Sequence, residues 1–236
     1  MVYCHFIVEH NWYIAHCVFE ILSEEFGLTR FIMAEFRLGQ SALDVCKVIV
    51  NHQPDISSVQ LIAHDVSVNW RQLHQTTREK LKNLRSGFEH VQPIKYQEYN
   101  RDEFNRLTLD ALPCIGRNEV WSIVSKVKLF SGKYKHLPMM NFHYENDYER
   151  DIKKVLKYIC GNNKGVLLES GRFLHYYGDF LLDENNWIKF MAEFLMPTVL
   201  VSPRYIGHRL YDGYCTLRLT IDSKYKTNIP KVVRIF

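Results

Sequence analysis

The segment from Gly165 to Gly178, GVLLESGRFLHYYG, decides the fold that we expect. An apolar run breaks at Ser170-Gly171-Arg172 and resumes through His175, which is typical of two strands joined by a short polar loop. Glycine lets a backbone approach a ligand, and arginine offers a planar fork of donors that suits phosphate. Two interpretations stay open from these residues. The loop binds an anionic ligand, or it is a plain hairpin whose Ser-Gly serves the turn and whose histidine lies in the core.

The charge of the chain is uneven along its length. The 236 residues include 30 lysines and arginines and 26 aspartates and glutamates, for a formal net charge of +4. Residues 1–120 hold 12 basic and 15 acidic side chains, a net −3, whereas residues 121–236 hold 18 and 11, a net +7. A basic second half favours a polyanionic partner, although a solvated basic surface gives the same bias.

Composition also bears on the class of protein. A hydrophobic content of 47% is enough for a packed core and argues against disorder. The six cysteines form no Cys-x-x-Cys pair, so neither a disulfide framework nor a closed zinc site is indicated. The start MVYCHFIVEH lacks the features of a signal peptide, and the apolar stretch FMAEFLMPTVLV is too short to span a bilayer. We expect a reduced, cytoplasmic protein without a membrane segment.

Residues 1–118 are typical of an N-terminal α/β lobe. Ser41 is a good helix cap, Gln53-Pro54 breaks a helix, and VQLIAHDV has the composition of a buried strand. The expected elements are a helix capped by Asn11, a strand over 30–38, a helix from Ser41 through Val50, a strand over 59–66, and helices over 70–85 and 102–109.

Residues 119–236 predict a second lobe in which helices cover one face of a sheet. The expected elements are a hairpin of residues 119–130 and 133–145 that turns at Ser131-Gly132, a helix over 148–160, the strand pair around Ser170, a helix over 183–195, a short basic segment over 205–212 and a strand over 214–221. The predicted fold class is therefore α+β.

Charged and polar rows follow the predicted hairpin. Lys126 and Lys128 fall on one face of its outgoing strand, and Lys133 and Lys135 on one face of the return. A ladder of four lysines can track a phosphate backbone, although exposed charges are ordinary on edge hairpins. These lysines are our candidate nucleic-acid-binding residues.

The order of these parts resembles the archaeo-eukaryotic primase superfamily, and most closely bacterial proteins described as primase-like. The resemblance covers roughly residues 120–222 and rests on SGRFLHYY, MMNFHYE and LVSPRYIGHRLYDGYCTLRL. It implies an N-terminal α/β unit followed by a lobe with an RNA-recognition-like sheet, the core of primase-polymerases. The family carries an acidic pair on a strand, a Ser-x-His-type loop and a further acid.

The acidic positions of the family are altered in this chain. In the family, these acids hold two divalent metals that activate the attacking hydroxyl and clamp the triphosphate. The matching residues here are Asn141, His143 and Ser202, and asparagine and serine are poor magnesium ligands. We expect a degenerate site. One divalent ion, manganese or magnesium, held through His143, Glu145 and His175 remains an open alternative, and a two-residue shift of the alignment would make Glu145 the motif acid.

The residues that bind anions in the family have better matches in this chain than the acidic ones. Ser170, Arg172 and His175 match the loop that touches the nucleotide phosphates in the family, and Arg209 and Arg218 match basic residues behind the site. Such charge-assisted contacts can hold a triphosphate without a metal. Each arginine also has a structural interpretation.

We therefore expect a catalytically weak primase-like module that binds nucleotide or nucleic acid, with His143 and His175 as catalytic candidates. The resemblance also implies that the module is a subunit with a protein partner in a replication, repair or defence assembly. The alternative is an active metal-dependent nucleotidyltransferase with a rearranged site, and a third interpretation is a structural, partner-binding protein. Carboxylates near His143 and His175 would favour the nucleotidyltransferase. Neutral and basic groups there would favour the binding module.

Overall fold

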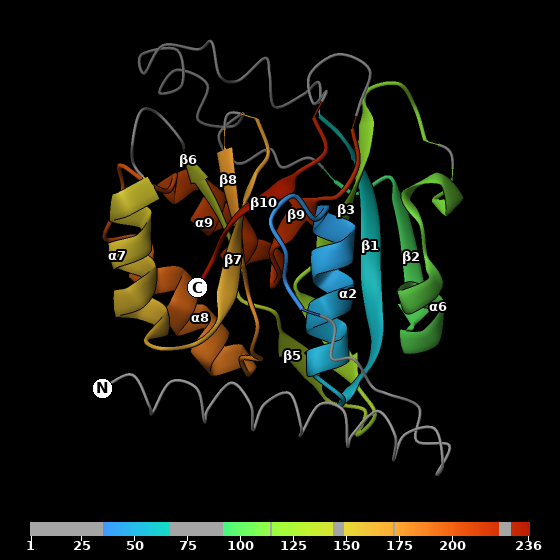
Figure 1. The fold of residues 1–236 in the computed structure, drawn as a ribbon, viewed down its shortest axis with the longest axis horizontal. Coiled ribbons are helices and arrows are strands. Elements are labelled where there is room, and N and C mark those ends of the chain that lie inside the picture. The colour runs from blue at the N-terminus through green and yellow to red at the C-terminus, as the bar shows by residue number, and fades with distance from the viewer. Residues whose placement is uncertain (1–34, 67–91, 114, 144–148, 172, 222–227) are drawn as a thin grey trace, which may run out of the picture. The chain divides into compact units, whose positions relative to one another are not determined.

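The computed structural model describes residues 35–66, 92–113, 115–143, 149–171, 173–221 and 228–236. Residues 35–236 form one compact unit, whose described part holds two antiparallel sheets and several helices (Figure 1). The predicted α+β class is confirmed. The helices predicted from Asn11 and over 70–85 lie outside the described residues.

Five α-helices and ten strands make up the regular structure of the described residues. The helices are α2 (Ala42–His52), α6 (Arg101–Arg106), α7 (Glu149–Cys160), α8 (Glu184–Glu193) and α9 (Pro203–Asp212), and a 3-10 turn spans Leu109–Ala111. The strands are β1 (Ile56–Asp65), β2 (Lys95–Asn100), β3 (Glu119–Val124), β4 (Lys126–Leu129), β5 (Tyr134–His136), β6 (Met139–His143), β7 (Gly165–Glu169), β8 (Phe173–Gly178), β9 (Thr216–Arg218) and β10 (Lys231–Ile235). No described helix has both the length and the apolar character that a membrane span requires.

The helix ends follow local sequence signals. The Ser41 side chain accepts a hydrogen bond from the Asp44 N–H at the start of α2, as predicted, and Asp183 caps α8 in the same way. Gly161 follows α7 with a positive φ of 63°, which suits the expected helix stop. Residues 35–38, in contrast, are not part of a strand.

The six-stranded sheet is built around β1. This strand pairs with β2 on one side and with β3 and β4 on the other, while β3 also pairs with β9 and β4 with β5. The helix α2 lies against this sheet, and α6 contacts both β1 and β2 (Figure 1). Because β1 precedes residue 118 and β3 follows it, the predicted domain boundary runs between strands that share one sheet.

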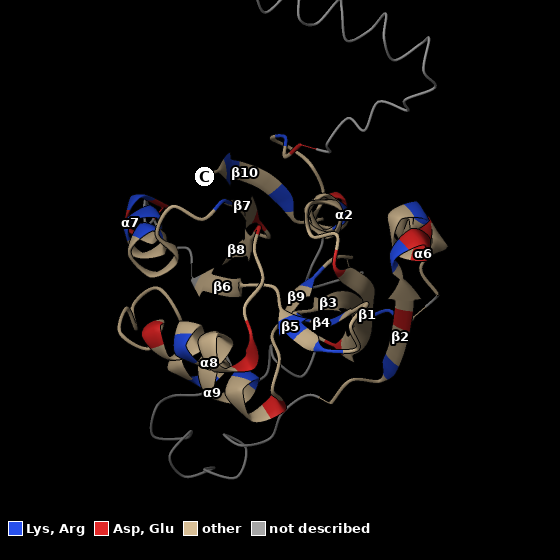
Figure 2. Ribbon diagram, turned by 90° about the horizontal axis from the view of Figure 1, so that it is seen from below, with Lys and Arg blue, Asp and Glu red and all other residues tan. Residues whose placement is uncertain are grey.

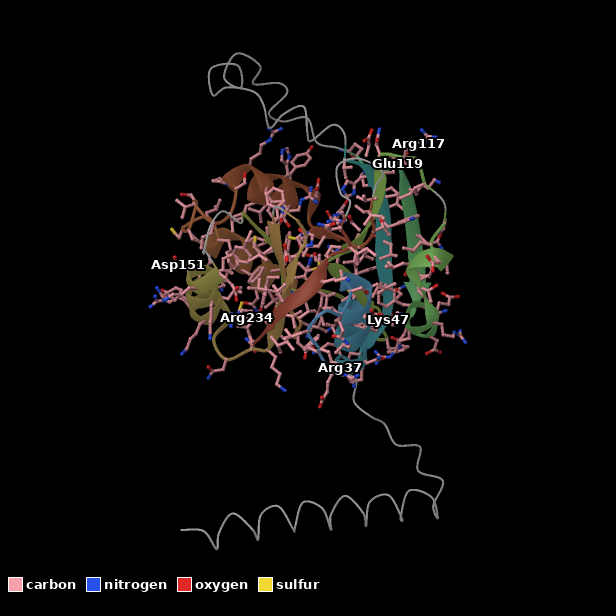
Figure 3. All side chains as sticks on the ribbon, turned by 45° about the horizontal axis from the view of Figure 1, so that its top comes forward. Arg37, Lys47, Arg117, Glu119, Asp151 and Arg234 are labelled. Carbon is pink, nitrogen blue, oxygen red and sulfur yellow. The ribbon has the colours of Figure 1, made fainter. Side chains whose placement is uncertain are left out.

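The four-stranded sheet has the order β10-β7-β8-β6. Helices cover one of its faces: the Phe142 ring of β6 meets the Phe194 ring after α8 edge-to-face, with centroids 5.5 Å apart. Arg234 of β10, labelled in Figure 3, forms an ion pair with Glu149 of α7. No strand was predicted over the residues of β10, which pairs with β7 and forms one edge of the sheet.

The long hairpin predicted over residues 119–145 is wrong. Its outgoing half is divided at Ser125, whose backbone N–H donates to the Cys215 carbonyl (2.8 Å) instead of to the returning strand. The returning half ends with β5 at His136, and Pro138, two residues later, has no N–H to donate. Consequently β4 and β5 form a short hairpin, and β6 crosses to the other sheet, where it pairs with β8.

A buried arginine links the two sheets. Arg218 of β9 is 7% exposed, and its Nη2 donates to the Ser170 carbonyl (3.0 Å) in the loop between β7 and β8. Its Nη1 donates to the carbonyls of Thr220 (2.6 Å) and Asn228 (2.7 Å). One guanidinium therefore satisfies backbone acceptors from three separate segments.

Replacing this arginine tests the link. We expect Arg218→Leu to lower the free energy of unfolding by about 3 kcal/mol, because it removes the donor of three carbonyls, that of the buried Ser170 included. Arg218→Lys should lower it less. Urea unfolding followed by circular dichroism measures the stability of both variants. Lys231→Leu, which also removes a charge but at an exposed position, is the control. Equal stability of Arg218→Leu and the wild type would contradict the structural role.

Candidate functional site

The predicted ligand loop is a tight hairpin turn. The Ser170 N–H donates to the Phe173 carbonyl (2.9 Å), and the Ser170 hydroxyl donates to the same oxygen (3.0 Å). Gly171 has a φ of 96°, which an L-residue rarely adopts, so the turn requires glycine. The plain-hairpin interpretation therefore describes the backbone, while the ligand role stays a prediction. Arg172 lies outside the described residues.

Two of the predicted site residues are direct neighbours across strands. Asn141 of β6 is the Cα partner of His175 of β8, so the two side chains share one face of the four-stranded sheet. His175 is buried, and Asn141 is half-buried with its Oδ1 buried and unbonded within the described part of the chain. His143 ends β6 with its Cα opposite Phe173. Glu145 lies outside the described residues.

Tyr177 adds a polar group that sequence reasoning missed. It lies two residues after His175 on the same strand face and is completely buried. Burial raises the pKa of Tyr177 well above its ordinary value, while the nearby positive charge of Arg218 lowers that pKa. Tyr177 is therefore within the electrostatic influence of the arginine that links the sheets. The strand alternation in FLHYYG was the available signal.

Arg209 lies on α9, where it makes internal contacts. Its Nη1 donates to the Thr216 hydroxyl (2.8 Å), and its Nη2 forms an ion pair with Asp212 (3.1 Å). Burial raises the pKa of Asp212, and the charge of Arg209 opposes that shift. Arg209 thereby fixes α9 to β9. Ser202 occupies the N-cap position of α9 without a side-chain capping bond. The phosphate role of Arg209 stays a prediction.

The described donors do not fit a pair of magnesium ions. Magnesium prefers carboxylate oxygen, but the described groups at this position are the amide of Asn141, the imidazole of His175 and the phenol of Tyr177. Within the described residues, no group of three or more His, Cys, Asp or Glu side chains is arranged to hold a metal. The alternative ligand set of His143, Glu145 and His175 stays a hypothesis, because Glu145 lies outside the described residues.

The four candidate lysines do not form one ladder. Lys126 and Lys128 share a face of β4, but Lys135 is the cross-strand partner of Val127 and belongs to the opposite face. Lys133 lies in the loop before β5. Lys126 also pairs with Glu184 (3.1 Å). The lysines are therefore distributed over both faces of a short hairpin.

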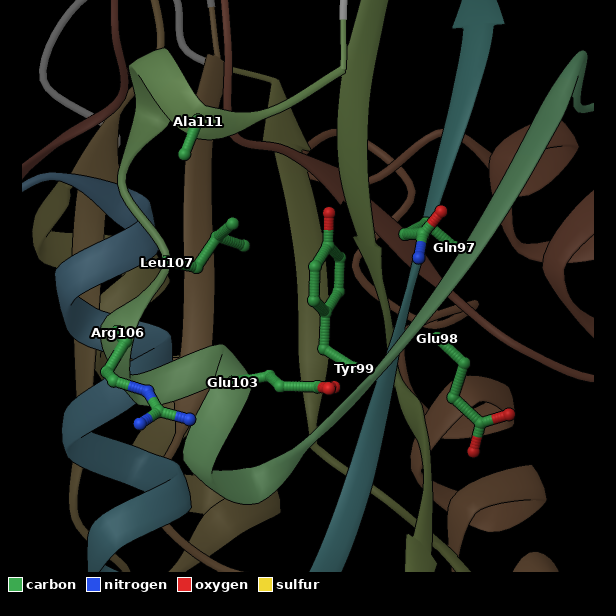
Figure 4. A pocket seen from close by; sticks show the side chains of 7 residues that line it. All are labelled: Gln97, Glu98, Tyr99, Glu103, Arg106, Leu107 and Ala111. Carbon is green, nitrogen blue, oxygen red and sulfur yellow. The ribbon is translucent and has the colours of Figure 1, made fainter.

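A pocket of about 490 Å³ lies between β2 and α6 (Figure 4). Its lining includes Tyr99, Glu103 and Arg106 together with Leu107. It contains none of the residues that the sequence predicted. Glu103 already accepts a hydrogen bond from the Asn100 N–H in a capping box, so part of the lining serves the helix start.

A second buried histidine was also missed. His136 of β5 stacks on Trp187 of α8 with centroids 4.4 Å apart, and its Nε2 lies 3.1 Å from a Glu184 oxygen. Its Nδ1 lies 3.3 Å from the Ser125 hydroxyl. Burial lowers the pKa of His136, and the hydrogen bond with Glu184 opposes that effect only in part. The imidazole is therefore held neutral in a structural position between sheet and helix.

This neutral histidine predicts a pH dependence of stability. The unfolded chain binds a proton at His136 near its ordinary pKa of about 6.5, before the folded chain does, so stability falls as the pH drops below that value. We expect His136→Phe, which keeps a ring beside Trp187, to lose stability less steeply between about pH 7 and pH 5. Urea unfolding across that range measures the slope. A variant as steep as the wild type would contradict the assignment.

One of three comparisons with known proteins found a match. Residues 101–231, which are more than half of the chain, match the family described as archaeo-eukaryotic primase 1D-like, in the AEP-like group. The match includes Asn141, the Ser170 turn, His175, Arg209 and Arg218. Neither the curated proteins nor the solved structures contain a match to this chain. On the family match, this chain belongs to the archaeo-eukaryotic primase 1D-like family.

Proposed function

We propose that this primase-like module binds a nucleotide or a nucleic acid end at the Ser170–His175 hairpin and has little catalytic activity of its own. The observation that carries the proposal is the composition of the polar face. Asn141 and His175 are direct cross-strand partners, and Arg218 holds the carbonyl of Ser170. The described groups of this face are neutral or basic, as expected for an anion-binding module.

Arg172 is the residue that we expect to meet phosphate. Arg218 already donates to three carbonyls, so most of its hydrogen-bonding capacity serves the structure. Arg172 follows the glycine of the two-residue turn, and its guanidinium suits bidentate contact with phosphate oxygens. In this proposal Arg218 fixes the turn, and Arg172 supplies the charge. A protein partner in replication, repair or defence remains part of the hypothesis.

Nucleotide binding should depend on salt and on Arg172. We expect ATP to bind with an affinity that falls as salt rises, because the triphosphate is held by charge. Arg172→Ala should weaken binding about tenfold or more, since a charge-assisted hydrogen bond is lost. Isothermal titration calorimetry at two salt concentrations measures this. Arg150→Ala, on the exposed face of α7, is the control, and an equal loss in both variants would count against the proposed site.

The altered acidic positions predict weak catalysis. We expect primer synthesis to be undetectable or very slow with magnesium, and any activity to prefer manganese, which imidazole accepts more readily. Loss of one group that stabilises a transition state costs on the order of a hundredfold to a thousandfold in rate. Asn141→Asp restores a carboxylate at the motif position, so we expect it to raise metal-dependent synthesis. A primase assay with each metal measures the rates.

The control for added charge is Asn162→Asp, at an exposed position after α7. It should leave synthesis unchanged. Robust magnesium-dependent synthesis by the wild type, abolished by combining Glu145→Ala with His175→Ala, would favour the alternative of an active nucleotidyltransferase. Synthesis that persists in that double variant would indicate a contaminating polymerase.

A further inference from the structure

The β4–β5 hairpin exposes two aromatic rings among lysines. Phe130 is 71% exposed and Tyr134 is 55% exposed, although rings of this size usually contribute to a core. Lys128 and Lys133 are exposed as well, and neither forms an ion pair with another described residue. Figure 2 shows basic residues on β4 and β5. The hairpin therefore presents apolar rings and available ammonium groups on one small surface.

Cations flank the ring of Tyr134. Lys128 is its direct cross-strand partner, and Lys126 lies two residues earlier on the same face of β4. The Lys126 Nζ lies 5.9 Å from the centre of the Tyr134 ring. Tyr134 is thus an exposed aromatic surface with positive charge on the strand beside it. A planar, electron-rich group that carries a phosphate fits both features.

The hairpin tip is held in place by backbone bonds. Gly132 has a φ of 78°, and its N–H donates to the Leu129 carbonyl (2.9 Å) to close a three-residue loop. The Phe130 N–H donates to the Asp55 carbonyl (2.9 Å), just before β1 begins. The exposed ring of Phe130 therefore stands on an anchored backbone. Such preorganisation reduces the entropy lost on binding.

We propose that this hairpin binds single-stranded nucleic acid, with unpaired bases stacking on Phe130 and Tyr134 and phosphates contacting Lys128 and Lys133. Stacking requires exposed base faces, which a duplex hides, so a single strand is preferred. The inference rests on the proposed function, because it adds a second contact surface for the same class of ligand. The surface is separate from the Ser170 turn. In the sheet order β5-β4-β1-β3-β9 the hairpin lies at one end, and Arg218, which contacts Ser170, lies on β9 at the other end.

Fluorescence anisotropy with a labelled oligothymidylate of about 12 nucleotides tests the hairpin. We expect the double variant Phe130→Ala, Tyr134→Ala to bind this strand about tenfold more weakly or worse, because two stacking surfaces are lost. An abasic strand of the same length should bind both proteins equally. The double variant Lys128→Gln, Lys133→Gln should reduce the salt slope by about 0.7 for each lysine removed.

Matched controls come from α7, which carries exposed basic residues and Tyr158, a ring that is 88% exposed. Tyr158→Ala and the pair Lys153→Gln, Lys157→Gln should leave oligothymidylate binding close to wild type. Equal losses in the α7 and hairpin variants, an equal loss for duplex DNA, or no oligothymidylate binding at all would overturn the inference. ATP binding should be unchanged in the hairpin variants, so failure of the Ser170 site and failure of the hairpin give different results.

Discussion

The contact on which the two sheets depend is the buried guanidinium of Arg218. A buried charge is costly unless its hydrogen bonds are made, and this one donates to the carbonyls of Ser170, Thr220 and Asn228. Because these oxygens belong to different segments, the arginine fixes the β7–β8 turn, the end of β9 and the approach to β10 together. The Ser170 end of the β7–β8 turn is therefore held at the junction of the two sheets.

This arrangement gives Arg209 and Arg218 structural roles, whereas a phosphate contact is proposed for Arg172. A family resemblance assigns Arg209 and Arg218 alike to the region behind the nucleotide, but both are buried and bonded within the protein. These two arginines would affect anion binding only indirectly, because each fixes the position of an element beside the polar face. A loss of binding in an Arg218 variant would consequently need a stability measurement beside it. Arg172 and the hairpin lysines are the residues proposed to contact the ligand, so their replacement is the more direct test of binding.

Local signals in the sequence predicted α2, α7 and α8 well, whereas strand pairing was harder to predict. Ser41 and Asp183 cap helices through contacts within three residues, and such contacts are visible in a sequence. The division of the predicted hairpin depends on Ser125 meeting Cys215, which is remote in the chain. The contact that Arg218 makes with the Ser170 carbonyl joins residues 48 positions apart, so its surroundings could not be predicted from local signals either. At the candidate site, the pairing of Asn141 with His175 depends on the register of β6 against β8, which no local signal specifies. The missed groups Tyr177 and His136 likewise required knowledge of what packs against them.

The family match does not coincide with the folding unit. It begins at residue 101 and ends at 231, whereas β1 ends at Asp65 and is the strand on which β2, β3 and β4 pair. Without β1, the backbone donors and acceptors of β3 and β4 would lose their partners along that edge, and a buried edge without partners is unfavourable. The last strand, β10, also extends beyond the match and pairs with β7, directly before the Ser170 turn. The matched region therefore carries the candidate site, while β1 before it and β10 at its end complete the two sheets that hold the site.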